Sequence, residues 1–186
     1  RQPRLRALVR VERDAPRQAI PPHMRNCYIA DNVILGPTPW WPGAIHANGK
    51  NLGEGIQVSG PGNVICHNLV SGFRDCISIM EGRFAWEQRC IDIYENDISG
   101  GADDGIEADY AFDNCRILRN RITNCMRGIA LAPVLGGPAY VIRNVLYNTE
   151  HVWQLGRMGA GYVVLHNTSV DGKLKDLKAT VDRDAA

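Results

Sequence analysis

Ile65-Cys66-His67-Asn68-Leu69-Val70 is the stretch that decides the fold, because its pattern returns at regular intervals along the chain. An apolar residue, two spacers, an asparagine, one spacer and a second apolar residue recur at 93–98, 117–122 and 141–146, and in weaker form around Asn167. The repeated asparagines are 28, 24, 24 and 23 residues apart. Short apolar runs with a period of about 20 to 30 residues predict a β-solenoid, in which each repeat forms one turn.

A second pattern precedes each asparagine segment. Gly55-Ile56-Gln57-Val58 alternates apolar residues with others, and related tetrapeptides stand at 76–79, 105–108 and 128–131. Alternation with a period of two is typical of a strand with one buried face. We therefore expect each turn to contain a strand that begins on a small residue, a bend, a second strand and then the asparagine bend. The segment 81–87 interrupts this spacing and predicts a loop extruded from one turn.

The repeated asparagine suits a tight bend, because asparagine tolerates left-handed backbone geometry. Strands of neighbouring turns lie ~4.8 Å apart, so stacked amides can hydrogen-bond from one turn to the next. We expect these asparagines to form a structural ladder and to take no part in catalysis. His67 and His166 precede two of them and are expected at the solvated surface, whereas His151 is expected in a loop or at a junction between turns.

A single domain is expected for a chain of 186 residues. About five to six turns are predicted over 26–171, including an early turn through 28–34. Residues 1–25 are expected to form an entering strand or cap, and residues 172–186 a C-terminal cap or tail. A solenoid this short has open strand edges, which predicts a fragment of a longer chain, strong caps, or end-to-end or homo-oligomeric association.

Composition narrows the class of function. The net charge is +1 and charged residues make up 22% of the chain, so no basic field predicts a nucleic-acid partner. No apolar run approaches the ~18 residues of a membrane span, so we expect no membrane association. The six cysteines lack the Cys-x-x-Cys spacing of zinc sites. We expect most of them to pack as small apolar side chains, with disulfides in a secreted protein as the alternative.

These repeats resemble the right-handed parallel β-helix superfamily, the pectate-lyase-like fold, over about residues 26–171. The resemblance implies an all-β, right-handed, single-stranded parallel β-helix. Members of the superfamily include polysaccharide lyases, polygalacturonases, alginate epimerases and phage tailspikes. The resemblance therefore implies a polysaccharide partner and an extracellular or periplasmic location, although this fold hosts several chemistries.

Alignment of the turns on the Gly-Ile pattern places Glu54, Asp75, Asp104 and Arg127 in one column, with one residue from each turn. We call this set the acidic column. At ~4.8 Å between turns, two of its carboxylates would nearly touch, which is costly unless they are protonated, paired with a cation or bound to a metal. Four polar residues accompany the column: Arg74, Asp103, Glu107 and Asp109. This density of charge predicts an active site, and a surface charge ladder is the alternative.

The resemblance implies a leading mechanism of the polysaccharide-lyase or epimerase type. Asp75, Asp104 and Glu107 would hold Ca²⁺, because hard oxygen ligands on adjacent turns suit that ion. The ion would neutralise a uronate carboxylate and acidify its α-proton, and Arg127 would act as the base. An arginine base needs a strong perturbation, because its reference pKa exceeds ~12.

A second mechanism is inverting hydrolysis of the polygalacturonase type. That family places an aspartate on one turn and an Asp-Asp pair on the next, and here Asp75 and Asp103-Asp104 stand in those positions. One carboxylic acid would protonate the leaving oxygen while another activates water. The chain departs from that family on the following turn, where it has Met126-Arg127-Gly128 instead of Gly-His-Gly.

Two tryptophans complete the candidate substrate-binding set. Trp40 and Trp41 lie in a loop rich in proline and glycine, where their rings would stack on sugar faces or cover the core. The candidate substrate-binding residues are therefore Trp40, Trp41, Arg74, Glu107 and Asp109. A non-catalytic glycan-binding solenoid and a structural, filament-forming solenoid are the alternatives from other classes of protein.

Overall fold

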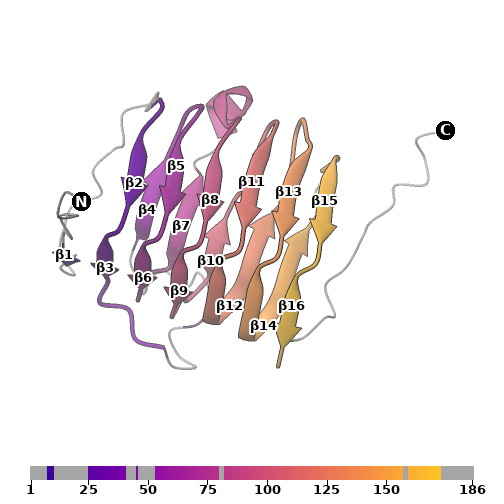
Figure 1. Ribbon diagram of the computed structural model, residues 1–186. Coiled ribbons are helices and arrows are strands. Elements are labelled where there is room, and N and C mark those ends of the chain that lie inside the picture. The colour runs from indigo at the N-terminus through magenta and orange to yellow at the C-terminus, as the bar shows by residue number, and fades with distance from the viewer. Residues whose placement is uncertain are drawn as a thin grey trace.

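The computed structural model describes residues 8–10, 25–40, 45, 53–79, 82–156 and 159–172. The chain winds as a parallel β-solenoid of about five turns, with successive strands stacked along one axis (Figure 1). This confirms the predicted all-β solenoid, and the arrangement is compatible with a right-handed coil. Most of the predicted cap and tail, and Trp41, lie outside the described residues. The described part of the chain contains no helix with the length and apolar character of a membrane span.

Each turn carries up to three short strands, so the solenoid has three faces. Face I contains β2 (Tyr28–Ala30), β5 (Val64–Cys66), β8 (Asp92–Tyr94), β11 (Cys115–Leu118), β13 (Ala139–Ile142) and β15 (Tyr162–Leu165). Face II contains β3 (Val33–Leu35), β6 (Leu69–Ser71), β9 (Asp97–Ser99) and β16 (Thr168–Val170), and β1 (Leu8–Arg10) pairs with β3. Face III contains β4 (Glu54–Val58), β7 (Asp75–Ile79) and β10 (Asp104–Glu107).

Two long strands join faces II and III. They are β12 (Arg121–Leu131) and β14 (Val145–Leu155), and each runs through face II into face III, which makes one ten-stranded sheet. We number the turns by their face I strand, so that turns 1 to 5 begin at β2, β5, β8, β11 and β13. The sequence prediction of two strands in each turn holds for turns 4 and 5 and was wrong for turns 1 to 3, where it missed the separate strands of face II. These are only three residues long on most turns, too short for a visible alternation.

The asparagine ladder is present and lies at the bend between faces I and II. Asn68 Nδ2 donates to Asn96 Oδ1 at 3.0 Å, and the Asn68 amide nitrogen donates to the same oxygen at 3.0 Å. Asn68 Nδ2 also reaches the Ile29 carbonyl oxygen of the preceding turn at 2.9 Å. The same bonds link the ladder residues from Asn32 to Asn167. The predicted structural ladder is therefore confirmed.

The backbone role predicted for these asparagines was wrong by one position. The residue with left-handed geometry is the one before each ladder asparagine, for example His67 with φ 56° and Glu95 with φ 53°. The asparagine that follows is buried, as at Asn68 and Asn96, and its amide spans the bend. The bend therefore needs asparagine for its two-sided hydrogen bonding more than for its conformational tolerance.

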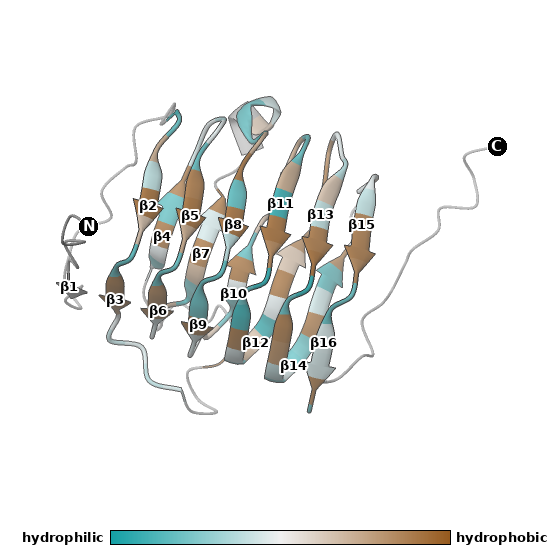
Figure 2. Cartoon of the chain, viewed as in Figure 1, coloured by the Kyte–Doolittle hydropathy of each residue, from teal (hydrophilic) through white to brown (hydrophobic). Residues whose placement is uncertain are grey.

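The core is a stack of aliphatic side chains enclosed by the three faces, while polar residues concentrate at the bends (Figure 2). Each face contributes a continuous column, such as Ile65, Ile93 and Ile117 on face I. Four of the six cysteines are buried in or beside this core, Cys27 is half-buried and Cys90 is exposed, and all six are free thiols. The predicted extruded segment contains a 3-10 helix, η1 (Gly82–Glu87), between β7 and β8.

Turns 3 and 4 are held in register by ion pairs around the perimeter of the solenoid. An acidic residue of turn 3 faces an arginine 24 residues later in each pair. The pairs are Asp92–Arg116, Glu95–Arg119, Asp97–Arg121 and Asp103–Arg127. The first three are largely exposed and contribute little each, whereas the fourth belongs to the acidic column.

Candidate functional site

Strand register on face III brings the acidic column together. Glu54 pairs with Asp75 across β4 and β7, and Asp104 pairs with Arg127 across β10 and β12. The Asp104 amide nitrogen donates to Asp75 Oδ1 at 3.0 Å, which joins turn 3 to turn 2 at this point. The predicted alignment of the four residues is thus observed.

On turns 1 to 4 the residue after the column residue is small (Gly55, Cys76, Gly105 and Gly128), and at the glycines a Cβ would clash with neighbouring atoms. A Cβ at Gly105 would lie 2.6 Å from Ile122 Cγ2 and 2.8 Å from the Gly128 carbonyl oxygen. A Cβ at Gly128 would lie 2.1 Å from Leu146 Cδ2. Asp104 faces outward at this bend, because its Oδ1 lies 3.3 Å from Arg127 Nη1 and the Arg127 side chain is 26% exposed. The Gly-Ile pattern therefore places the column on the outer surface of the bend between faces II and III.

Two arginines bind the carboxylates of the column. Arg74 Nη2 lies 2.9 Å from Glu54 Oε1, and its Nε lies 2.7 Å from Asp75 Oδ2. Arg127 Nη1 contacts Asp103 and lies 3.3 Å from Asp104 Oδ1. Arg74 therefore holds two carboxylates of the column, from turns 1 and 2, and Arg127 holds Asp104 together with the adjacent Asp103.

The column has a buried layer and an outer layer. Asp75 and Asp104 are only 1% and 3% exposed, whereas the side chains of Arg74 and Arg127 are 27% and 26% exposed. Glu107, the last residue of β10, is half-buried and accepts a hydrogen bond from Ser78 Oγ at 2.9 Å. A ligand arriving from solvent would therefore meet the two guanidinium groups and Glu107 before the two buried aspartates.

Three carboxyls of the site have raised pKa values. Burial raises the pKa of Asp75 to about 6, although Arg74 acts in the opposite direction. Burial, followed by the negative charge of Asp75, raises the pKa of Glu107 to about 7. Burial and the neighbouring carboxylates of Asp103 and Asp75 hold the pKa of Asp104 well above its usual range. Carboxyls of the site therefore keep a protonated fraction near neutral pH, where ordinary carboxyls are ionised.

The pKa of Arg127 moves away from the value that a base requires. Burial lowers it, but the carboxylates of Asp104 and Asp103 outweigh burial, so the pKa rises above its ordinary value. Arg74 behaves in the same way, with Asp75 as its main partner. Both guanidinium groups are therefore held in the charged form.

Oxygen donors for a cation are present in two overlapping groups. Glu54, Asp75 and Glu107 form one group and Asp75, Asp103 and Asp104 the other, with ligand oxygens within 4.8 Å of one another in each. This donor chemistry suits Ca²⁺. However, the guanidinium groups already bind every one of these carboxylates except Glu107 by the ion pairs given above, so a metal ion would have to compete with them.

The remaining predicted substrate-binding residues are less closely tied to the column. Asp109 follows β10, and its Oδ1 accepts a hydrogen bond from the Ala132 amide nitrogen at 2.7 Å, which supports a bend. Trp40 is half-buried in the segment after β3, and Trp41 lies outside the described residues. The structure therefore brings Arg74, Asp103 and Glu107 to the column and gives Asp109 a structural hydrogen bond to the next turn.

His151 extends the column by one turn, and the sequence prediction that it lies in a loop or junction was wrong. It belongs to β14 and pairs in register with Arg127. The Gly-Ile pattern could not find it, because turn 5 has Val152-Trp153 at the corresponding positions. The only signal available was its spacing of 24 residues from Arg127, which equals the distance between ladder asparagines of these turns.

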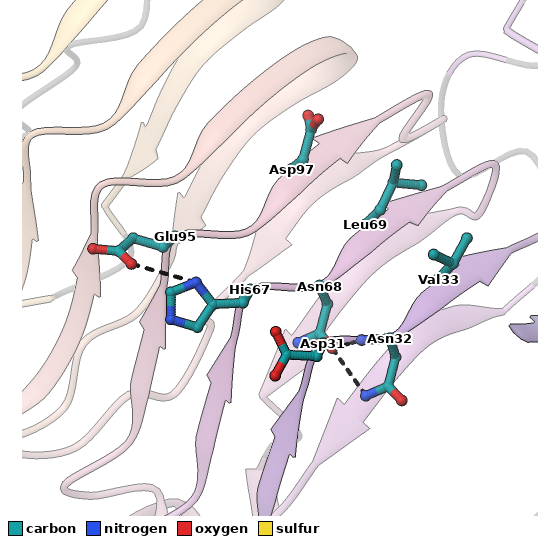
Figure 3. A pocket seen from close by; sticks show the side chains of 8 residues that line it. All are labelled: Asp31, Asn32, Val33, His67, Asn68, Leu69, Glu95 and Asp97. Atoms are coloured by element: carbon teal, nitrogen blue, oxygen red, sulfur yellow. Dashed lines mark hydrogen bonds and ion pairs between the residues drawn. The ribbon is translucent and has the colours of Figure 1, made fainter. Parts of the chain in front are cut away.

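An open pocket of about 350 Å³ lies elsewhere, at the bend between faces I and II (Figure 3). Val33 and Leu69 project beside it from neighbouring strands, and His67 Nδ1 lies 3.4 Å from Glu95 Oε2. Glu95 also binds Arg119, and the asparagines of the pocket belong to the ladder. Its polar groups are thus engaged in structural contacts, and the pocket is separate from the acidic column.

Comparison with known proteins found no matching family model, no matching curated protein and no matching solved structure.

Proposed function

We propose that the protein cleaves glycosidic bonds of a polysaccharide by general acid–base chemistry at the acidic column. The observation that supports this most strongly is the set of raised pKa values at Asp75, Asp104 and Glu107 on two adjacent turns. A general acid is most effective when its pKa lies near the working pH. Most glycosidases cleave their substrate with a pair of carboxyl groups whose pKa values are shifted apart.

Glu107 is the proposed general acid. It is half-buried, it is positioned by Ser78, and its pKa of about 7 leaves a large protonated fraction at neutral pH. It would donate this proton to the leaving glycosidic oxygen. Asp75 lies within 4.8 Å of Glu107 and supports the raised pKa through its negative charge.

Asp103 is the proposed partner carboxylate. Its side chain is 13% exposed, more than that of Asp104, and Arg127 holds it in place. It would activate a water molecule or orient the substrate. In this scheme Asp104 and Asp75 are the buried supporting residues, while Arg74 and Arg127 bind oxygens of the glycan.

The protonation state of Arg127 favours hydrolysis over elimination. The raised pKa of Arg127 makes its neutral form rarer, and a neutral guanidine is what an elimination base requires. Calcium-dependent elimination is the second candidate, because two groups of three oxygen donors lie in the column. Bound there, Ca²⁺ would supply neutralisation of a uronate carboxylate. Both candidates would belong with the pectate-lyase-like enzymes and act in an extracellular or periplasmic setting.

The test is product analysis over pectate, alginate, glycosaminoglycans and neutral xylan, each with Ca²⁺ and with chelator. We expect new reducing ends without unsaturated products, insensitive to chelator, and a loss of at least about a hundredfold in rate in Glu107→Gln. Glu95→Gln is the matched control, because Glu95 is an exposed glutamate on the same turn at another bend.

Three other outcomes would contradict this proposal. Unsaturated products that require Ca²⁺ would support the lyase and refute hydrolysis. Glycan retention without any product would refute both enzymes and support a binding solenoid. Equal activity of Glu107→Gln and Glu95→Gln would refute the acidic column as the site.

A further inference from the structure

A second row of residues runs along face III beside the acidic column. Strand register aligns one residue from each of turns 1 to 5 in this row. We call it the outer row, and its members are Gln57, Ser78, Glu107, Ala130 and Gln154. The proposed general acid, Glu107, is the only ionisable side chain in the outer row.

The two glutamines of the outer row point away from the core. Gln57 stands between a buried isoleucine and a buried valine, which are 5% and 0% exposed. Gln154 stands between Trp153, which is 8% exposed, and Leu155, which packs against the core. Since both neighbours of each glutamine face inward, strand alternation directs the two amides outward.

Three long side chains of the outer row are accessible, on turns 1, 3 and 5. Gln57, Glu107 and Gln154 are half-buried, whereas Ser78 and Ala130 are 0% exposed. Neither glutamine amide has a hydrogen bond or ion pair within the part of the chain that the structure describes. Each amide stands two strand spacings, or ~9.6 Å, from Glu107 along the axis. A ligand that contacts all three side chains must therefore lie along the solenoid axis.

The acidic column beside the outer row has more negative than positive groups. Each of its two guanidinium groups is already paired with two carboxylates. Five carboxyl groups are present against these two cations, at Glu54, Asp75, Asp103, Asp104 and Glu107. A carboxylate of a bound glycan would add to this excess, and like charges in close proximity are costly. The charge of Asp75 already contributes to the raised pKa of Glu107.

We propose that the site takes an uncharged polysaccharide, and that Gln57 and Gln154 bind hydroxyl groups of its sugars on either side of Glu107. A side-chain amide both donates and accepts hydrogen bonds, as a sugar hydroxyl does, so this contact requires no compensating ion. The inference rests on the proposed function, since it names the substrate class of the same site. The glycan lies along the axis, with its cleaved bond at turn 3 and further sugars at turns 1 and 5.

The first test is calorimetry of the whole protein with hexasaccharides of different charge. The neutral probes are the hexamers of xylose, mannose and glucose, the anionic probe is hexagalacturonate, and the cationic probe is a glucosamine hexamer. The sugars are recovered afterwards and checked for cleavage. We expect a neutral hexamer to bind at least about tenfold more tightly than either charged one. Its affinity should not change with salt concentration, because the contact pairs no charges.

The second test removes the two amides. We expect Gln57→Ala and Gln154→Ala each to bind the best neutral hexamer about fivefold more weakly, as the loss of one neutral hydrogen bond requires. The double variant should lose about 25-fold, because the two residues stand ~19 Å apart and their effects add. Asn148→Ala is the matched control, since Asn148 is an exposed amide outside the outer row. Far-UV circular dichroism checks that all variants keep the fold.

Several results would overturn the inference. These are tightest binding by hexagalacturonate or by the glucosamine hexamer, binding by none of the neutral hexamers, and equal affinities of the two glutamine variants and Asn148→Ala.

The inference and the proposed function fail separately. Cleavage of pectate that Glu107→Gln abolishes would overturn the inference and leave the acid–base site intact. Binding of a neutral hexamer through Gln57 and Gln154, without cleavage of any polysaccharide, would support the substrate class and refute the proposed enzyme.

Discussion

Asn120→Ala should destabilise the protein strongly, because Asn120 is a central and buried rung of the asparagine ladder. Its Nδ2 donates to the Ile93 carbonyl oxygen at 2.9 Å and to Asn144 Oδ1 at 3.0 Å. Its Oδ1 accepts from the Asn96 amide nitrogen at 3.0 Å and from Asn96 Nδ2 at 2.9 Å. Alanine removes all four bonds and leaves buried polar groups of Asn96 and Ile93, on turn 3, without these partners.

The size of the effect follows from these four bonds. A hydrogen bond contributes about 1 kcal/mol net, and an unsatisfied buried polar group costs about 1–3 kcal/mol. We therefore expect Asn120→Ala to lower the free energy of unfolding by about 4 kcal/mol. The matched control is Asn148→Ala, because Asn148 is exposed and its Nδ2 donates to Asn124 Oδ1 at 2.8 Å. That variant should lose less than about 1 kcal/mol.

Urea denaturation followed by circular dichroism measures both values, with the slope m checked for constancy. An Asn120→Ala variant within about 1 kcal/mol of the native protein would refute the reasoning. So would equal losses in Asn120→Ala and Asn148→Ala, because the ladder would then contribute no more than an exposed amide pair.

Three further predictions concern the column and its strands. Gly128→Ala should cost about 1–3 kcal/mol in urea denaturation, because its Cβ would lie 2.7 Å from the Val152 carbonyl oxygen; unchanged stability would contradict the account of the Gly-Ile pattern. Arg127→Ala should cost about 3 kcal/mol, and Arg121→Ala less than about 1 kcal/mol, because only the first leaves a buried carboxylate without its cation; equal losses would contradict this. Stability should fall as pH rises from 5 to 7.5, because Glu107 has a pKa of about 7 when folded and 4.5 ordinarily, so the folded state binds more protons; a Glu107→Gln profile no flatter than the native one would contradict this.

The ladder and the alignment of the column could be predicted from the sequence because both depend on spacing alone. Once the solenoid is recognised, residues 24 apart, such as Asn120 and Asn144, must stack. The same rule aligned Asp104 with Arg127, although these stand 23 residues apart. Where the repeat carries a fixed residue type, the one-dimensional sequence therefore contains the contact.

Other features were beyond such reasoning for physical reasons. The strands of face II are short, and their single inward residue, such as Val70 or Ile98, shows no periodicity. The left-handed backbone conformation is found at His67 and not at Asn68. The hydrogen bonds of Asn68 to the neighbouring turn outweigh the local preference of asparagine for that conformation. His151 was missed because its turn has valine where the others begin on a smaller residue.

The chemistry of the column was predictable only in outline. The density of acids indicated a site, but which carboxyls are buried depends on side-chain placement. Arg74 binds Glu54 and Asp75, so that Glu107 is left as the carboxyl without an arginine partner. Residue spacing alone does not show which carboxyl the arginine binds. The perturbed pKa values follow from this arrangement in three dimensions.

The most direct test of the central claim is a carbon-13 NMR titration of the Glu107 carboxyl, assigned from the Glu107→Gln variant. The claim is that the acidic column stores protons near neutral pH for acid–base chemistry. A midpoint near pH 7 is the predicted result, because burial and the charge of Asp75 both oppose ionisation. A midpoint near the ordinary glutamate value of 4.5 would contradict the claim and remove the general acid from the proposed site.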